Sequence, residues 1–232
     1  MAGENTIHFD ILNKALKFIL PTGSSYIELL CLFFALYFLA RDKAIFWRIT
    51  MWYIVLVMLT EVIGRYFAIT YHTNLFIYNI YTIFEFSFIT YGLYTFIKQY
   101  ANIKYWLLAT YAAIMLIYIV YTITFGINVY NVLTVSVMSV IFVIYGLLYF
   151  LLLLKDENFI DLKFHPAFWW VGGTLIFYFG STLANFFDDI IQQKFLGKYN
   201  TRLIIYTTLN LFLYGFWAYS FICRARQRKT CP

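Results

Sequence analysis

The sequence predicts an all-α integral membrane protein, built as a bundle of seven transmembrane helices. Its 232 residues are 63% hydrophobic and 12% charged, against about 25% charged in a typical soluble domain. Seven apolar stretches match the length of about 20 helical residues that a bilayer core requires. They cover residues 24–40, 45–70, 76–97, 105–125, 129–154, 166–191 and 202–223. A β-barrel is not expected, because its strands would alternate apolar and polar residues.

Lys and Arg in the short connections predict the orientation, because cytoplasmic loops of membrane proteins carry an excess of both. Eleven of the 17 Lys and Arg fall on the side that holds the C-terminus, five fall on the other side, and Arg65 lies inside a span. We therefore expect the N-terminus outside and the C-terminus in the cytoplasm. The net charge of +6 is then explained by topology, and a nucleic-acid partner is not expected.

The chain is predicted to form one membrane domain at 24–223, with short segments before and after it. Residues 1–23 contain an amphipathic pattern that predicts a helix lying on the outer membrane interface. Residues 224–232 form a basic cytoplasmic tail. Its candidates for contact with anionic lipid or with a partner protein are Arg224, Arg226, Arg228 and Lys229.

Ionisable side chains inside the hydrocarbon core are costly, which makes them candidates for function. Glu61 and Glu85 both fall about 14 Å from the outer ends of their spans, and Asn210 about 12 Å, at about 1.5 Å per helical residue. Arg65 lies one turn from Glu61, at the i, i+4 spacing of an ion pair. Asn185 approaches from the outer end of its own span. The inner halves of the spans carry no charged residue.

We interpret this one-sided distribution as an outward-facing pocket for a small ligand or ion, closed below by aromatic residues. The candidate ligand-binding residues are Glu61, Arg65, Glu85, Asn185 and Asn210, with Glu28, His72 and Asp188 as secondary candidates. Glu85 has no cationic partner in the spans, so we expect it to be protonated or paired with a bound cation. Two alternatives stay open: a polar network that only fixes helix packing, and a proton path. For Asp188, near the headgroups, a solvated charge is the simpler interpretation.

The sequence predicts neither a catalytic centre nor a metal or cofactor site. Its histidines are His8, His72 and His165, and His165 is expected on the opposite face from the others, so a zinc site would have to recruit carboxylates. The last span contains no Lys for a retinal Schiff base, and the three cysteines form no C-x-x-C pair. We do not expect an enzyme.

Two stretches of the sequence, FWWVGGTLIFYFGS at 168–181 and YTIFEF at 81–86, resemble segments of largely uncharacterised seven-helix membrane proteins of Bacteroidota. Similar membrane domains in that group occur alone or ahead of a histidine kinase. The resemblance therefore implies a sensor-like domain of a bacterial inner membrane, without known catalytic residues. Because only a short tail follows the last span here, it also implies that any signal passes to a separate partner.

These observations together favour a sensor or receptor-like membrane protein that binds a small ligand or ion. One alternative is a small-solute or cation transporter that uses the same carboxylates for coupling. Near-absence of proline from the spans counts against it, since secondary transporters often use broken helices. The other alternative is a non-catalytic membrane subunit that docks a helix of another protein.

Overall fold

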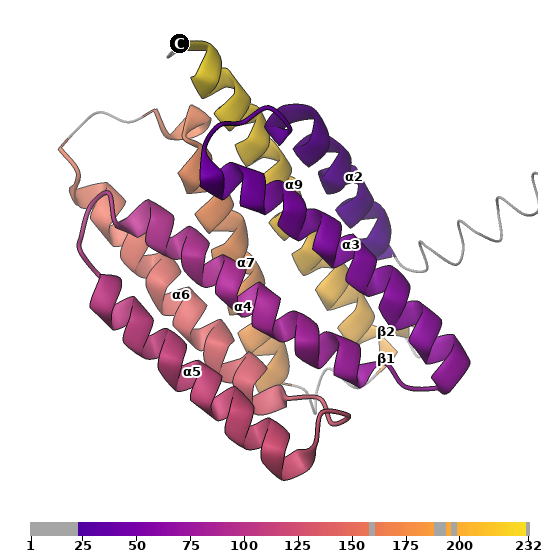
Figure 1. Ribbon diagram of the computed structural model, residues 1–232. Helices are drawn as coiled ribbons and strands as arrows, with labels where there is room; N and C mark the ends of the chain where they lie inside the picture. The colour runs from indigo at the N-terminus through magenta and orange to yellow at the C-terminus, as the bar shows by residue number, and fades with distance from the viewer. Residues whose placement is uncertain (1–22, 158–160, 188–193, 196–198, 231–232) are drawn as a thin grey trace, which may run out of the picture.

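The computed structural model describes residues 23–157, 161–187, 194–195 and 199–230. This part of the chain is almost entirely α-helical (Figure 1). The helices are α2 (Gly23–Leu39), α3 (Ile45–Tyr71), α4 (Leu75–Ile97), α5 (Lys104–Phe125), α6 (Val132–Lys155), α7 (Pro166–Phe186) and α9 (Thr201–Thr230). A short 3₁₀ turn at Leu162–Phe164 precedes α7, and β1 (Lys194–Phe195) pairs with β2 (Tyr199–Asn200) in an antiparallel arrangement.

Five helices, α3 to α7, are long and apolar enough to cross a membrane, which confirms the predicted class of helical membrane protein. The first and last predicted spans correspond to α2, a shorter apolar helix of 17 residues, and to α9, a helix of 30 residues with basic residues in its last turn. Whether these two also cross the membrane stays a prediction, as does the orientation.

Several predicted boundaries differ from the structure. The fifth predicted span began at 129, but α6 begins at Val132, because the Asn131 side chain accepts a hydrogen bond from Thr134 N at 3.0 Å and caps the helix. The sixth span was predicted to 191, whereas α7 ends at Phe186. The basic residues of the predicted tail at 224–232 belong to the last turns of α9, which continues to Thr230. The expected interfacial helix within 1–23 and the candidate Asp188 lie outside the described residues.

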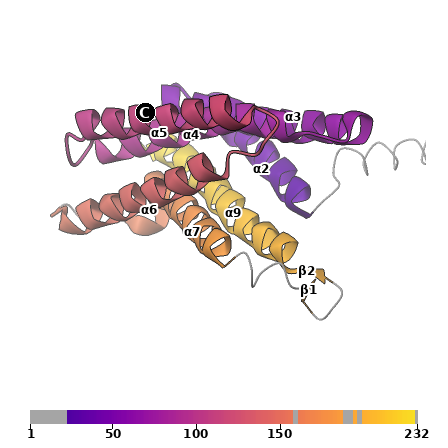
Figure 2. The same cartoon turned by 90° about the horizontal axis from the view of Figure 1, so that it is seen from below.

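Six helices form a closed ring in the order α2, α3, α4, α6, α7 and α9, with α9 packed against α2. Among the helices described, α5 lies outside this ring against α4 and α6. Figure 2 shows α3, α4 and α5 on one side of the molecule and α6 and α7 on the other, with α9 running obliquely between the two sides. A closed ring has an interior shielded from lipid, which is where polar side chains of a membrane helix are expected.

The sequence of α2 explains why an acidic residue points into this interior. Its buried residues recur every three or four positions and so form one face of the helix, which packs against α3 and α9: Ser25, Glu28, Cys31, Ala35 and Leu39. Glu28 is therefore carried inward by the same stripe that packs the helix.

Small residues bring α7 and α9 close together. A Cβ atom at Gly173 would lie 2.8 Å from Phe216 Cβ and 3.1 Å from the Leu213 carbonyl oxygen. One at Gly180 would lie 2.4 Å from a methyl group of Leu209. Glycine at these two positions is what allows the backbones to approach, as small residues do at many transmembrane helix interfaces.

Aromatic side chains fill the ring on the side toward the C-terminal end of α9. Trp170 and Trp217 are fully buried and stack with ring centroids 5.3 Å apart and planes 5° apart. The indole nitrogen of Trp217 donates to the Trp170 carbonyl and to Thr174 Oγ1, at 3.2 Å in both cases. The Tyr53 and Phe88 rings stack beside them at 3.9 Å. This cluster fills the interior of the ring at that end, and its members Tyr53 and Trp217 also line a cavity described below.

A buried amide ties α4 to the connection between α5 and α6. Asn79 Nδ2 donates to the carbonyls of Ile127 at 2.6 Å and Val129 at 2.8 Å, while its Oδ1 accepts from Asn131 N at 3.1 Å. The Tyr118 hydroxyl donates to the Asn79 carbonyl at 3.1 Å. The donors and acceptors of Asn79 are thus paired within the protein, so this polar cluster fixes the packing of the helices.

Candidate functional site

A cavity of about 140 Å³ lies inside the helix ring, and we call it the carboxyl cavity. It is lined from α2, α3, α4, α7 and α9. Its polar lining residues are Glu28, Thr60, Glu61, Glu85, Asn210, Tyr53, Tyr78, Tyr81, Tyr178 and Tyr214. Side chains from across the whole chain thus converge on one small space.

The structure brings together part of the predicted ligand-binding set. Glu61, Glu85 and Asn210 all line the carboxyl cavity, and the secondary candidate Glu28 joins them. Two other candidates, Arg65 and Asn185, are absent from its lining. His72 lies exposed at the C-terminal end of α3 in the left-handed backbone conformation, with φ of 56°.

Helical periodicity places the acidic residues and tyrosines on the same faces. On α4, Tyr78, Tyr81 and Glu85 are spaced by three and four residues, so their side chains lie one above the other. On α3, Gly64 leaves room for the tyrosine of the neighbouring helix, since a Cβ there would lie 3.2 Å from the Tyr78 hydroxyl. Tyr78 and Glu61 both line the carboxyl cavity.

The three carboxyl groups differ in how well they are satisfied. Glu85 Oε1 accepts a hydrogen bond of 2.7 Å from the Tyr178 hydroxyl. Glu28 is only 5% exposed, and its Oε2 is buried without a hydrogen-bond partner in the described part of the chain. Glu28 also lies close enough to Glu61 for the two charges to repel. A buried carboxyl oxygen without a donor is costly, so a bound donor or cation would stabilise this arrangement.

The lining favours a cation over an anion. Among the lining residues described there is no Lys, Arg or His to balance the three carboxyl groups. The described residues also contain no group of three His, Cys, Asp or Glu placed to hold a metal ion. The cavity instead surrounds its carboxyl groups with the aromatic rings of tyrosines and Trp217. Ring faces attract organic cations, and an engineered protein cavity of about 150 Å³ is large enough for benzene.

A second cavity of about 340 Å³ lies beside the first, between α4, α6, α7 and α9. Both cavities are lined by Glu85, Phe177 and Tyr178, so the hydrogen bond between Tyr178 and Glu85 lies at their common wall. The predicted candidate Asn185 lines this second cavity and accepts a hydrogen bond of 3.1 Å from the Tyr206 hydroxyl. The pocket expected from the sequence is therefore divided into two.

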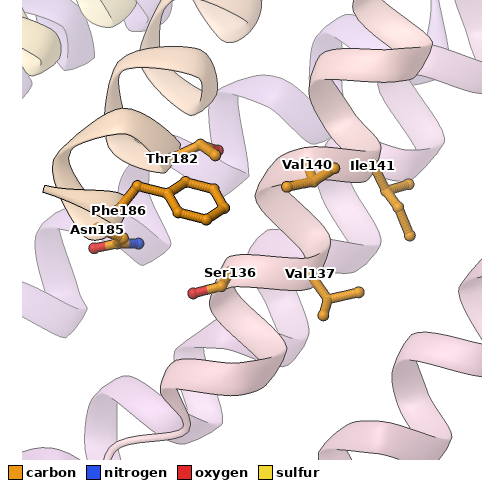
Figure 3. Close-up of a pocket in the computed structure, with 7 residues that line it drawn as sticks. All are labelled: Ser136, Val137, Val140, Ile141, Thr182, Asn185 and Phe186. Atoms are coloured by element: carbon orange, nitrogen blue, oxygen red, sulfur yellow. The ribbon is translucent and has the colours of Figure 1, made fainter.

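A third hollow, of about 360 Å³, is an apolar groove between α6 and α7. Its lining comes from two turns of each helix: Ser136, Val137, Val140 and Ile141 on α6, and Thr182, Asn185 and Phe186 on α7. Figure 3 shows the Phe186 ring directed from α7 toward Val140 on α6. Asn185 lines both this groove and the second cavity.

At the other end of the molecule, a buried acidic residue binds two of the predicted lipid-contacting or partner-contacting arginines. Asp42, between α2 and α3, accepts from Arg224 Nε at 2.9 Å through Oδ2 and from Arg224 Nη2 at 3.2 Å through Oδ1. Arg228 Nε lies 3.4 Å from Asp42 Oδ2, and its Nη2 donates to the Phe38 carbonyl at 2.5 Å. These arginines therefore hold α9 against the α2–α3 connection.

The charge of Asp42 is stabilised by this arrangement. Burial would raise the pKa of Asp42, but the hydrogen bonds from Arg224 and from Ala44 N, with the charges of Arg224 and Arg228, hold its pKa below the usual range. Of the other two basic candidates, Arg226 stacks over the Phe164 ring at 3.7 Å and Lys229 is exposed.

Sequence reasoning missed the tyrosines of the carboxyl cavity. Their signal is their helical spacing from an acidic residue, as in Tyr81, four residues before Glu85. That signal is weak in this chain because it contains 22 tyrosines, and five of them line the carboxyl cavity. The second cavity was missed for another reason: it depends on which helices are neighbours, and the sequence does not define the order of the ring.

Comparison of the chain with models of protein families, with curated proteins and with solved structures finds no match in any of the three. The resemblance to seven-helix proteins of Bacteroidota therefore stays a prediction, and the geometry of the cavities carries the functional argument.

Proposed function

We propose that this protein is a seven-helix membrane receptor or sensor that binds a small organic cation in the carboxyl cavity. The observation that carries the proposal is the convergence of Glu28, Glu61 and Glu85, with aromatic rings around them, in a cavity whose described lining includes no basic residue. Such a site attracts positive charge and shields it from lipid. The rings add cation–π attraction, worth about 0.5–2 kcal/mol for a favourable pair.

In this proposal α2 and α9 are the first and last of seven spans, with the N-terminal end of α2 outside and the C-terminal end of α9 in the cytoplasm. The excess of Lys and Arg on the latter side supports this orientation. The cavity then faces the outer half of the membrane. A bacterial inner membrane is the location that the family resemblance implies.

A signal could pass along α9, which is continuous from the cavity to the basic end of the molecule. Trp217 lines the cavity and Arg224 lies seven residues later, about 10 Å along the helix at about 1.5 Å per residue. A small shift of α9 on ligand binding would therefore move the arginines that hold Asp42. We propose that a cytoplasmic partner reads this change, as a shift between two helix packings.

Ligand binding is expected to depend on the least satisfied carboxyl group. Wild-type protein in detergent should gain thermal stability with tetramethylammonium, and Glu28→Gln should weaken its apparent affinity about tenfold, the equivalent of losing about 1.4 kcal/mol of charge interaction. The measurement is a thermal unfolding series over tetramethylammonium concentration.

The matched control is Glu157→Gln, which removes one negative charge from an exposed position in the connection after α6. It should leave the tetramethylammonium response unchanged. Sodium chloride at equal ionic strength serves as the second control. An equal response of wild type, Glu28→Gln and Glu157→Gln to tetramethylammonium would show that the cation acts outside the cavity and would refute the proposed site.

A transporter is the second candidate, favoured by one observation: the Tyr178–Glu85 hydrogen bond lies between two cavities. Movement of Tyr178 would join them into a longer path. This candidate is tested with proteoliposomes that contain the purified protein and radiolabelled choline. Flux that is lost in Glu85→Gln supports transport, whereas binding without flux supports the receptor.

A further inference from the structure

The second cavity and the apolar groove lie next to each other and share one lining residue. Asn185 lines both, and its Oδ1 is held by the Tyr206 hydroxyl at 3.1 Å. The groove is bounded by α6 and α7 (Figure 3), and Val140 on its α6 side is 40% exposed. An occupant that displaced the Asn185 side chain would therefore reach from the second cavity to the exposed edge of the groove.

The second cavity differs from the carboxyl cavity in its charges. Its lining contains one acidic side chain, Glu85, and one basic side chain, Arg202, together with Ser139, Ser181 and Asn185. The guanidinium of Arg202 lies over the Tyr206 ring at 5.7 Å. A ligand that carries a positive and a negative group would thus find a partner for each within the same cavity.

We propose that the second cavity and the groove bind a zwitterionic phospholipid with an amine headgroup. Its phosphate lies at Arg202, since guanidinium groups recognise phosphate with paired hydrogen bonds. Its ammonium group reaches Glu85, and one acyl chain lies in the groove between Val140 and Phe186. This site is additional to the proposed cation site and goes beyond the proposed function.

The shared position of Glu85 couples the two sites. An ammonium group bound from the second-cavity side would share the Glu85 carboxylate with the Tyr178 hydroxyl. It also neutralises one of the three carboxyl groups that attract a cation to the carboxyl cavity. The lipid therefore lowers the affinity for tetramethylammonium, and the cation lowers the affinity for the lipid by the same factor.

The test measures which phospholipid the purified protein retains. Protein is exchanged into detergent with an equimolar mixture of phosphatidylethanolamine and phosphatidylglycerol carrying identical acyl chains, and bound lipid is identified by native mass spectrometry. Wild type is expected to retain phosphatidylethanolamine in about tenfold preference, the effect of one additional charge-assisted contact. Equal retention of the two lipids would overturn the proposal.

Two variants locate the site. Val140→Trp fills the groove and Arg202→Gln removes the phosphate partner, and each should lower the amount of phosphatidylethanolamine that is retained. Leu147→Trp is the control, because Leu147 is exposed on the same helix but does not line the groove. If Val140→Trp and Leu147→Trp retain the same lipid, the groove is not the site. Tetramethylammonium binding by Val140→Trp should persist, so failure of the lipid site is distinguishable from failure of the cation site.

Discussion

Replacing Gly92 by alanine should destabilise the protein by about 2–3 kcal/mol, because the added methyl group overpacks the aromatic core. A Cβ atom at this position would lie 2.3 Å from Trp170 Cη2 and within 3 Å of two further ring atoms. Trp170 cannot move aside easily, since it is fully buried and stacked on Trp217. The measurement is thermal or denaturant unfolding of the purified variant in detergent.

Gly215→Ala is the matched control for this prediction. Both glycines follow a tyrosine in a helix, but a Cβ at Gly215 would meet no heavy atom within 4 Å. Alanine there should be neutral or slightly stabilising, because alanine has the higher helix propensity. The double variant Gly92→Ala with Trp170→Phe should recover part of the loss. Equal stability of Gly92→Ala and wild type would contradict the packing of Trp170 against α4.

The second large effect is expected at Asp42. Replacement by asparagine leaves Arg224 and Arg228 without their buried counter-charge, and breaking a buried ion pair in this way costs about 3–5 kcal/mol. The side chain of Asp42 is fully buried, while those of Arg224 and Arg228 are 21% and 29% exposed. Partial exposure of the arginines places the expected loss near the lower end of that range. Unfolding of Asp42→Asn and of wild type at pH 7 provides the comparison.

The ion pairs of Asp42 with Arg224 and Arg228 also predict how the stability of the protein changes with pH. Because the pKa of Asp42 is lower in the folded protein than in the unfolded chain, its contribution to stability is present above the unfolded value of about 3.9 and is lost as the pH falls through the folded value. The difference in stability between wild type and Asp42→Asn should therefore be constant near neutral pH and shrink below about pH 4. A difference that instead grew toward acidic pH would contradict the ion pair.

Much of the architecture could be predicted from local sequence properties. Apolar length and composition predict helices, and five of the predicted spans are helices of sufficient length and hydropathy in the structure. The inward direction of Glu61 and Glu85 also follows locally, because a charged residue in a membrane helix is driven away from lipid. The polar amide of Asn210 is driven away from lipid for the same reason, and it lines the carboxyl cavity.

The arrangement of those helices could not be predicted, because it depends on contacts between distant parts of the chain. Asp42 and Arg224 are 182 residues apart, and neither carries a local signal of the other. Asn185 and Glu85 were expected in one pocket with Glu61, but the order of the ring places Asn185 behind the Tyr178–Glu85 wall. Arg65 was expected in the same pocket from its i, i+4 spacing, yet the lining of the carboxyl cavity excludes it.

The central claim is that the carboxyl cavity selects an organic cation for its charge. Isothermal titration of the purified protein with choline, and with its uncharged isostere in which carbon replaces the nitrogen, tests this claim most directly. The two ligands share size and shape, so only the charge differs. The account predicts saturable binding of choline, absence of measurable binding for the isostere, and loss of choline binding in the Glu28→Gln, Glu61→Gln double variant. Equal affinity for both ligands, or undiminished choline binding by that double variant, would contradict it.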